Sequence, residues 1–331
     1  MSAPAWHRRV RTPSHAELDA AWQVVRGHLR PTPVVRTERP GVSLKLETLQ
    51  PTGAFKVRGA LAATASLGAH ERAITASAGN HGLGMAFAAA VLGRSATVVV
   101  AEDASPPKVA ALRARPVELV RHGSGFDAAE ARALELAGMD GQYVSGYNDV
   151  DVIAGNSTIG RELDDQVTGP VTVVCGVGGG GLCAGLALWA ARRDGARVVG
   201  VEVESSRAVS TAVAAGRVVP VEVGPTLADG LAGNVDDPCV TPGILAEHRV
   251  EMAVVTEDEL TAAMRWLFRE HGLVVEGAGA VGVAAVLAGR VEPASGGSVV
   301  AVLTGRNIAV DAYRRVLAGD PSAGAAVREH S

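Results

Sequence analysis

Short β-branched segments alternate along this chain with Ala/Leu-rich segments of helical periodicity, and this alternation constrains the fold most. It favours a mainly parallel sheet that helices cover on both faces. Hydrophobic residues make up 47% of the chain and aromatic residues only 3%, so we expect a core of small aliphatic side chains. The fold class predicted is therefore α/β. Strands are expected at residues 42–47, 73–76, 96–100, 117–120, 171–175, 198–202, 252–255 and 298–303, and helices at 60–67, 83–92, 128–136, 182–193 and 260–271.

Charge and hydropathy limit the kinds of partner that this chain can bind. Its 331 residues carry a formal net charge of −4 and no long run of Lys or Arg, so no nucleic-acid partner is expected. Residues 171–191 carry no charge over a length that could cross a bilayer. Four consecutive glycines interrupt them, however, and each costs about 1 kcal/mol inside a helix. We expect a strand, a loop and a buried helix there, and no membrane segment.

The cysteines indicate the compartment. Cys175, Cys183 and Cys239 are an odd number without Cys-x-x-Cys spacing. We interpret them as reduced thiols of the core, which favours the cytoplasm. Polar residues follow the arginines near the N-terminus, so no signal peptide is expected.

A glycine-rich segment, Val-Val-Cys-Gly-Val-Gly-Gly-Gly-Gly-Leu at residues 173–182, follows an expected strand and opens an expected helix. Glycines allow backbone N–H groups to close around an anion at a helix N-terminus, where the helix dipole also favours negative charge. A phosphate-bearing ligand is therefore expected at this loop.

The same loop allows a second interpretation. Gly176, Gly178 and Gly181 satisfy Gly-x-Gly-x-x-Gly, and Glu202 ends the next expected strand about twenty residues further on. An NAD-dependent dehydrogenase would place a ribose-binding carboxylate there. The loop alone leaves this interpretation and a single-phosphate site open.

The segment before the first long helix contains a lysine between two apolar residues. Lys56 lies near the expected helix start, flanked by Phe55 and Val57. Apolar neighbours and a helix N-terminus lower the proton affinity of an amine, as an imine-forming lysine requires. The alternative is an ordinary surface lysine with its charge in solvent.

Residues 45–60 read Lys-Leu-Glu-Thr-Leu-Gln-Pro-Thr-Gly-Ala-Phe-Lys-Val-Arg-Gly-Ala. This segment resembles the cofactor-lysine signature of the tryptophan-synthase-β-like, fold type II pyridoxal-phosphate enzymes, in the branch of the threonine/serine dehydratases and serine racemases. Other segments of that branch follow in order, and the resemblance covers residues 31–308. They are Ser-Ala-Gly-Asn-His at 77–81, the glycine loop, Leu-Ala-Asp-Gly at 227–230, Glu-Gly-Ala-Gly at 276–279 and Leu-Thr-Gly-Arg-Asn at 303–307.

The resemblance implies a site for pyridoxal 5'-phosphate and the residues that form it. Lys56 would bind the cofactor as a Schiff base, and Phe55 would pack beside the pyridine ring. Asn80 would contact the 3-oxygen of the ring and Thr304 the pyridine nitrogen. Also implied are Gly178, Gly179, Gly180 and Gly181 for the phosphate, Glu276 for the cofactor, and Ser77, Ala78, Gly79, Asn80, His81 and Tyr147 for the substrate.

The implied reaction is β-elimination of water from a hydroxy amino acid such as L-threonine or L-serine, which gives a 2-oxo acid and ammonia. An amino-acid racemase or a β-replacement synthase of the same fold is the alternative. Racemisation needs a second acid/base group opposite the lysine, which the racemases supply as a serine. Ala78 occupies that position here, so elimination is expected.

Some positions depart from the branch. Asn156-Ser157 replaces the usual Gln-Gly, and the last segment reads Thr-Gly-Arg-Asn instead of Ser-Gly-Gly-Asn. The segments at Glu276 and Arg306 are similar to those of the hydroxyectoine-degradation dehydratases, so a larger hydroxy amino acid stays open. Glu202 matches a cation-binding Glu of the serine racemases, but the partner Asp is replaced by Ala208. No metal is expected, because a hard cation needs several oxygen ligands and one carboxylate is lost, although Glu204 leaves a substitute ligand open.

The family fold implies two α/β domains. We expect a large cofactor-binding domain of residues 1–72 and 148–331 and a small domain of residues 73–147. A homodimer is expected because it is usual in the family. No isoleucine-sensitive regulatory domain is expected, because the chain ends soon after the last matching segment.

Overall fold

The computed structural model describes residues 9–320, which form two compact units. The first unit holds residues 9–30 and 55–156, and the second holds 31–54 and 157–320. Each unit contains one β-sheet, and parallel pairing dominates in both sheets. The expected α/β fold with mainly parallel sheets is confirmed.

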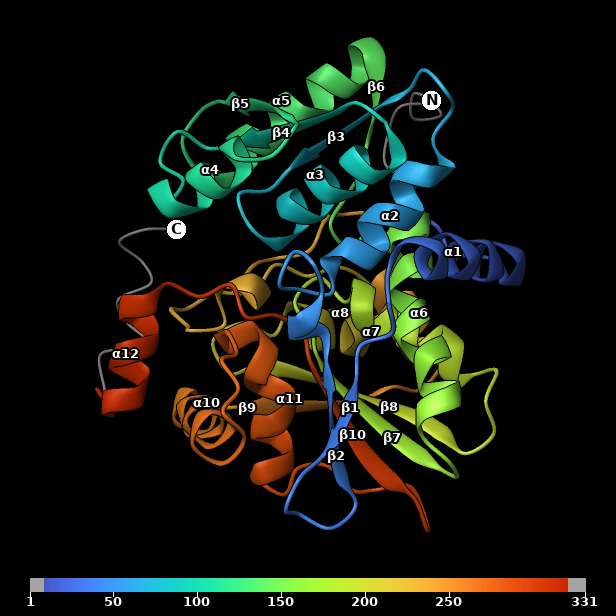
Figure 1. The fold of residues 1–331 in the computed structure, drawn as a ribbon, viewed down its shortest axis with the longest axis vertical. Helices are drawn as coiled ribbons and strands as arrows, with labels where there is room; N and C mark the ends of the chain where they lie inside the picture. The colour runs from blue at the N-terminus through green and yellow to red at the C-terminus, as the bar shows by residue number, and fades with distance from the viewer. Residues whose placement is uncertain (1–8, 321–331) are drawn as a thin grey trace. The chain divides into compact units, whose positions relative to one another are not determined.

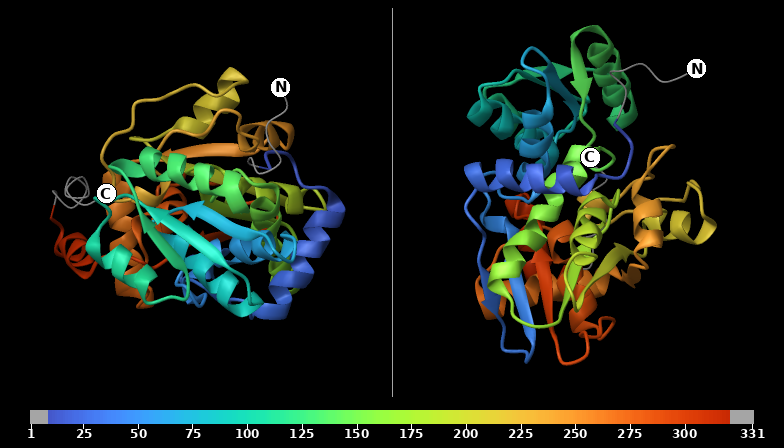
Figure 2. Two further views of the ribbon diagram at one scale, coloured as in Figure 1. Left: turned by 90° about the horizontal axis from the view of Figure 1, so that it is seen from above. Right: turned by 90° about the vertical axis from the view of Figure 1, so that its right-hand side faces the viewer.

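The sheet of the first unit has the strand order β5-β4-β3-β6, and all its strands are parallel. Successive side chains of a strand point to opposite faces. Ile74 therefore packs with α5, whereas its neighbour Ala73 packs with α2 and α3. Figures 1 and 2 show the strands of this unit side by side. Its elements are α1 (His15–His28), α2 (Lys56–Ser66), β3 (Arg72–Ala76), α3 (Asn80–Leu92), β4 (Ala96–Val100), α4 (Pro106–Arg113), β5 (Glu118–Arg121), α5 (Gly125–Asp140), β6 (Gly141–Tyr143) and the start of α6 (Val150–Gln166).

The helices α2 and α3 approach each other closely where Lys56 begins α2. A Cβ atom added to Gly84 of α3 would lie only 3.1 Å from the carbonyl oxygen of Lys56. A residue without a side chain therefore favours this approach, because a Cβ here would need its neighbour to give way slightly. The contact fixes the start of α2, and with it the lysine, against α3.

The sheet of the second unit has the order β1-β2-β10-β7-β8-β9, in which only the edge strand β1 is antiparallel to its neighbour. Helices cover both faces here too, because Val174 packs with the core on the α11 side and the next residue, Cys175, contacts Cys183 of α7. The elements are β1 (Val34–Arg36), β2 (Val42–Leu46), η1 (Glu47–Leu49), β7 (Val171–Gly176), α7 (Gly181–Ala190), β8 (Ala196–Val203), α8 (Ala208–Ala215), η2 (Asp229–Leu231), α9 (Thr241–Glu247), β9 (Glu251–Val255), α10 (Glu257–His271), α11 (Gly277–Leu287), β10 (Ser298–Leu303) and α12 (Val310–Ala318).

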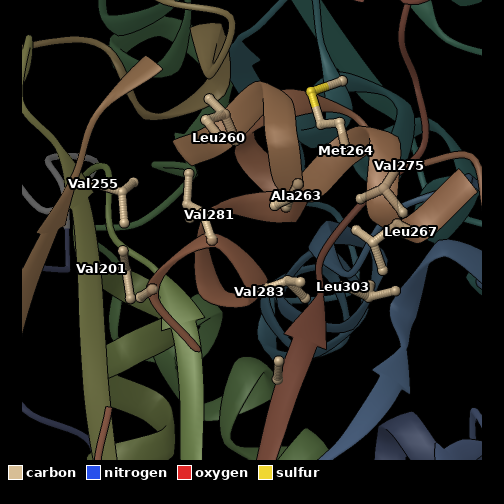
Figure 3. Close-up of a cluster of buried hydrophobic side chains, with 14 of the residues drawn as sticks. Val201, Val255, Leu260, Ala263, Met264, Leu267, Val275, Val281, Val283 and Leu303 are labelled. Atoms are coloured by element: carbon tan, nitrogen blue, oxygen red, sulfur yellow. The ribbon is translucent and has the colours of Figure 1, made fainter. Parts of the chain in front are cut away.

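The largest part of the core lies between this sheet, α10 and α11. Figure 3 shows side chains of α10 and α11 pointing toward residues of β8, β9 and β10. They are mostly Val, Leu and Ala, as the composition predicted. Among the residues drawn are Val201, Val255, Leu260, Ala263, Met264, Leu267, Val275, Val281, Val283 and Leu303.

Residues 171–191 form β7, the glycine loop and α7, as expected. Within residues 9–320, no helix has both the length and the apolar character that a membrane span requires. The predicted small domain, residues 73–147, lies inside the first unit, which also holds α1, α2 and the start of α6. The predicted limits of the cofactor-binding domain stay a prediction.

Candidate active site

In the first unit, the amine of Lys56 is held by a backbone carbonyl. Lys56 is the first residue of α2, and its Nζ donates a hydrogen bond to the carbonyl oxygen of Gly146 at 2.5 Å. The same Nζ lies 5.3 Å from the centre of the Phe55 ring. The half-buried lysine therefore has a defined direction in an environment that is partly apolar.

The segment 77–81 lies at the end of β3 and opens α3. Ser77 follows the strand, Gly79 donates its N–H to the Ser77 hydroxyl at 3.2 Å, and the helix begins at Asn80. Residues 77–80 are half-buried. Backbone N–H groups at such a helix N-terminus can bind a carboxylate.

His81 lies close to the segment that holds the lysine. Its Nε2 is 3.2 Å from the carbonyl oxygen of Val144, which can only accept, so Nε2 carries the proton. Burial, and next the charge of Lys56, lower the pKa of His81 to about 3. A Cβ added to Gly146 would lie 3.2 Å from the Cγ atom of His81. The neutral imidazole thus supports residues 144–146, the segment that holds the lysine amine.

In the second unit, the glycine loop joins β7 to α7 in a conformation that needs glycine. Gly180 has a φ of +82°, and a Cβ at Gly178 would lie 2.9 Å from the Cα of Leu231. No residue between 9 and 320 accepts a hydrogen bond from the N–H groups of Gly178, Gly179, Gly180 or Gly181. Four N–H groups at the start of a helix are thus available to an anion.

Glu276 and Thr304 lie together beside the start of α11. Glu276 precedes α11, and its N–H donates to the carbonyl oxygen of Gly305 at 3.1 Å. The Thr304 hydroxyl is 3.4 Å from the carbonyl oxygen of Ala278. Both side chains are buried. The hydroxyl of Thr304 can donate to one neighbour while its oxygen accepts from another.

Glu202 lies near the end of β8 and faces the start of α8. It is buried, and its carboxylate accepts hydrogen bonds from the N–H groups of Val209 at 2.9 Å and Ser210 at 3.2 Å. Burial raises the pKa of this carboxyl, and the N–H donors oppose the shift. Its hydrogen-bonding capacity thus serves the start of α8. Over the described range 9–320, no three His, Cys, Asp or Glu side chains gather as a metal site would need.

Each unit therefore brings together part of the predicted site. The first gathers Phe55, Lys56, the segment 77–81 and, next to Gly146, Tyr147. The second gathers the glycine loop, Glu276 and Thr304 around the start of α11 and Leu231. Sequence reasoning missed Gly146, because nothing in the local sequence marks a carbonyl as the acceptor of a lysine amine.

The chain is similar to known proteins over most of its length. A family model described as "Pyridoxal-phosphate dependent enzyme" matches residues 25–305. The L-threonine ammonia-lyase of Thermotoga maritima is 38% identical over 281 residues, which cover 83% of this chain and 69% of that protein. The crystal structure of the T.th. threonine deaminase superposes with a TM-score of 0.80 at 35% identity, covering 90% of this chain and 99% of the other. Maize serine racemase shares the fold, with a TM-score of 0.84 at 24% identity over 93% of this chain and 98% of that one.

Proposed function

Because the chain belongs to the family of pyridoxal-phosphate-dependent enzymes, we propose that it is an ammonia-lyase that eliminates water from L-threonine or a related hydroxy amino acid. The products are a 2-oxo acid and ammonia. The observation that carries the proposal is the position of Lys56. This residue lies in the segment that matches the family's cofactor-lysine signature, and its amine donates a hydrogen bond to the carbonyl oxygen of Gly146. The dehydrogenase alternative is wrong, because the family match identifies the cofactor and Glu202 is already bound by α8.

The residues fit pyridoxal 5'-phosphate. We propose Lys56 as the amine that binds the cofactor aldehyde, with Phe55 beside the ring and Asn80 at the 3-oxygen. The glycine loop offers the phosphate its unpaired N–H groups, and its backbone passes where side chains would collide with Leu231. Thr304 offers the pyridine nitrogen a neutral hydroxyl, and Glu276 lines the same end of α11. When bound, this cofactor withdraws electrons from the Cα of the attached amino acid.

The other steps belong to side chains and backbone of the chain. The N–H groups of segment 77–81 bind the substrate carboxylate. Tyr147, which follows Gly146 in the sequence, contributes to the same substrate site. Lys56 Nζ takes the proton from Cα, and this proton passes to the hydroxyl group on Cβ, which leaves as water. Since Gly146 accepts one N–H of the amine, its carbonyl orients the nitrogen for this transfer. Hydrolysis of the remaining enamine gives the 2-oxo acid and ammonia.

A trapping experiment tests the cofactor site. The purified protein should absorb visible light, and borohydride reduction followed by peptide mapping should locate the adduct on Lys56. The Lys56→Ala variant should give no covalent adduct under the same treatment. A colourless protein that takes up no pyridoxal 5'-phosphate, or an adduct on another lysine, would contradict the assignment.

A substrate panel tests the reaction. We expect 2-oxo acid release from L-threonine or L-serine, and the panel should include larger hydroxy amino acids because Arg306 and Asn156 depart from the usual branch residues. Lys56→Ala should lower the rate to background. If the wild-type protein binds the cofactor yet none of these compounds yields a 2-oxo acid, the ammonia-lyase proposal is lost.

We also propose little dependence on divalent cations, since the Glu202 carboxylate already accepts two backbone N–H groups and Ala208 offers no ligand. Activity should change less than about twofold on addition of a strong chelator. A large loss that magnesium or calcium restores would refute this. A cytoplasmic homodimer is proposed as well, supported by the absence of a disulfide among the cysteines of residues 9–320 and by the usual state of the family; sedimentation equilibrium of the full chain would test the dimer.

A further inference from the structure

A buried threonine lies behind the glycine loop, outside every motif that the sequence offered. Thr241 begins the helix α9, and its side chain has no exposure to solvent. Its Oγ1 donates a hydrogen bond to the carbonyl oxygen of Gly179 at 2.7 Å. Since a buried hydroxyl is costly unless it is bonded, this contact gives the loop a defined partner on its protein side.

The hydrogen bond fixes the direction of one peptide in the loop. In a trans peptide the C=O of one residue and the N–H of the next point in opposite directions. The Gly179 carbonyl points at Thr241, so the N–H of Gly180 points away from Thr241. That N–H is among the four that have no acceptor in the described part of the chain.

Packing leaves this peptide little freedom to rotate. A Cβ at Gly180 would lie 2.8 Å from Thr241 Oγ1 and 2.9 Å from its Cβ, so the threonine fills the space behind the loop. The Sγ of Cys239 is 3.3 Å from Thr241 Oγ1. Because the threonine proton is used toward Gly179, its oxygen can accept from the thiol. The hydroxyl is thereby held in one orientation.

We propose that Thr241 is a positioning residue for the phosphate group: its hydroxyl holds the peptide between Gly179 and Gly180 so that the Gly180 N–H faces the phosphate. The proposal rests on the proposed function, because it assumes that the loop binds the phosphate of pyridoxal 5'-phosphate. Thr241 acts on the phosphate through its hydrogen bond to the loop and not by touching the phosphate itself.

The proposed role of Thr241 can be tested by comparing the binding of two ligands that differ only in the phosphate group. Full-length protein freed of cofactor is titrated with pyridoxal 5'-phosphate and with pyridoxal, and the dissociation constants are measured by absorbance. Thr241→Val keeps the shape and removes the hydroxyl. We expect it to weaken binding of the phosphorylated ligand about tenfold, as the loss of a buried hydrogen bond predicts. Binding of pyridoxal should stay within about twofold of wild type.

Matched variants separate positioning from packing. Thr241→Ser keeps the hydroxyl and should restore the ratio of the two dissociation constants. Thr64→Val removes another buried threonine hydroxyl, one without a hydrogen-bond partner among residues 9–320, and should leave the ratio unchanged. If Thr241→Val does not fold, Thr241→Ser is compared with wild type instead. The ratio of its two dissociation constants should then be close to that of wild type.

The inference is overturned if Thr241→Val binds both ligands as wild type does, or weakens both equally, since either result shows no effect specific to the phosphate. The inference is also overturned if Thr241→Ser distinguishes pyridoxal 5'-phosphate from pyridoxal no better than Thr241→Val does. Failure of the proposed function looks different: wild-type protein would then bind neither ligand and give no adduct on Lys56.

Discussion

The methyl group of Ala78 leaves the segment 77–81 without a proton donor at its second position. Racemisation must return a proton to the face of Cα opposite Lys56, and an acid/base group there contributes about 10²–10⁴-fold. We therefore expect elimination to exceed racemisation by at least about a hundredfold. Each enantiomer of the best substrate is incubated with the enzyme, and both the 2-oxo acid and the opposite enantiomer are measured.

The variant Ala78→Ser asks whether one hydroxyl changes this balance. It should raise racemisation relative to elimination, while Lys56 continues to abstract the Cα proton. Racemisation as fast as elimination in the wild-type protein would show that another group, or an ordered water, supplies the second proton.

The neutral state of His81 makes a second prediction at the scale of one residue. Its pKa is about 3 in the folded chain and about 6.5 in an unfolded one, so between these values only the unfolded state gains a proton. The neutral imidazole therefore makes its full contribution to the unfolding free energy above about pH 6.5. That contribution is lost as the pH falls below this value, because the unfolded chain takes up a proton there. His81→Gln removes the titration, so the difference in unfolding free energy between wild type and variant should shrink by about 1 kcal/mol per pH unit from pH 6 to 4.

Urea unfolding of both proteins at several pH values measures this difference. Asp149, whose pKa burial raises to about 6, acts in the opposite direction because its folded form keeps a proton that the unfolded form releases. It is present in both proteins and cancels from the difference. A difference that does not depend on pH would mean that His81 titrates normally in the folded chain.

At the scale of elements, a buried ion pair joins β2 to α6. Lys45 Nζ contacts Glu162 Oε2 at 2.5 Å and also donates to the carbonyl oxygen of Thr32 at 2.7 Å, and neither charged side chain has appreciable exposure. Lys45→Met removes the ammonium that contacts Glu162 and Thr32 in this buried environment, which should cost about 3–5 kcal/mol of unfolding free energy. The double variant Lys45→Met with Glu162→Leu should recover most of this loss.

The unfolding free energies of wild type, the two single variants and the double variant, measured by chemical denaturation, form a double-mutant cycle for this pair. Losses that simply add in the double variant would show that the two charges do not depend on each other, contrary to their contact in the structure.

The sequence predicted the longer strands and several helices, and other elements were not among its predictions. The eight expected strands are all present, with ends within about two residues, because β-branched runs are an adequate signal for a buried strand. The strands β1 and β6 have only three residues each, too few for a period to show. The helices α1, α6 and α12 were not among the predicted helices, although each carries an apolar face.

The same limit applies to the site. Lysine and glycine motifs are local in sequence, so Lys56 and the glycine loop could be predicted from spacing and resemblance. Gly146 and Thr241 act through contacts between residues 90 and 62 positions apart, which only the packed chain brings together. Their contributions depend on a backbone carbonyl and a buried hydroxyl, and neither has a sequence signature.

At the scale of the whole molecule, the compact units differ from the expected domains because packing, not order along the chain, decides them. The family resemblance led us to expect that the small domain starts with the strand at residue 73, and that limit stays a prediction. Helix α2, however, packs on α3 through Gly84, so the chain from residue 55 belongs to the same compact unit. The segment 31–54 pairs instead with β10 in the other sheet.

The last prediction concerns the stability of the complete protein with and without its cofactor. A ligand that binds only the folded chain stabilises it by RT ln(1 + [L]/Kd), which is about 2.7 kcal/mol at a hundredfold excess over Kd. Removal of pyridoxal 5'-phosphate should therefore lower the unfolding temperature, and added cofactor should restore it in a concentration-dependent way. The increase should be smaller for Lys56→Ala, because the glycine loop still offers its N–H groups to the phosphate but the covalent bond is lost. Thermal unfolding over a range of cofactor concentrations measures this, with NAD at the same concentrations as a control that should have no effect. Stabilisation by NAD, or an equal response of wild type and Lys56→Ala, would contradict the assigned cofactor or the assigned lysine respectively.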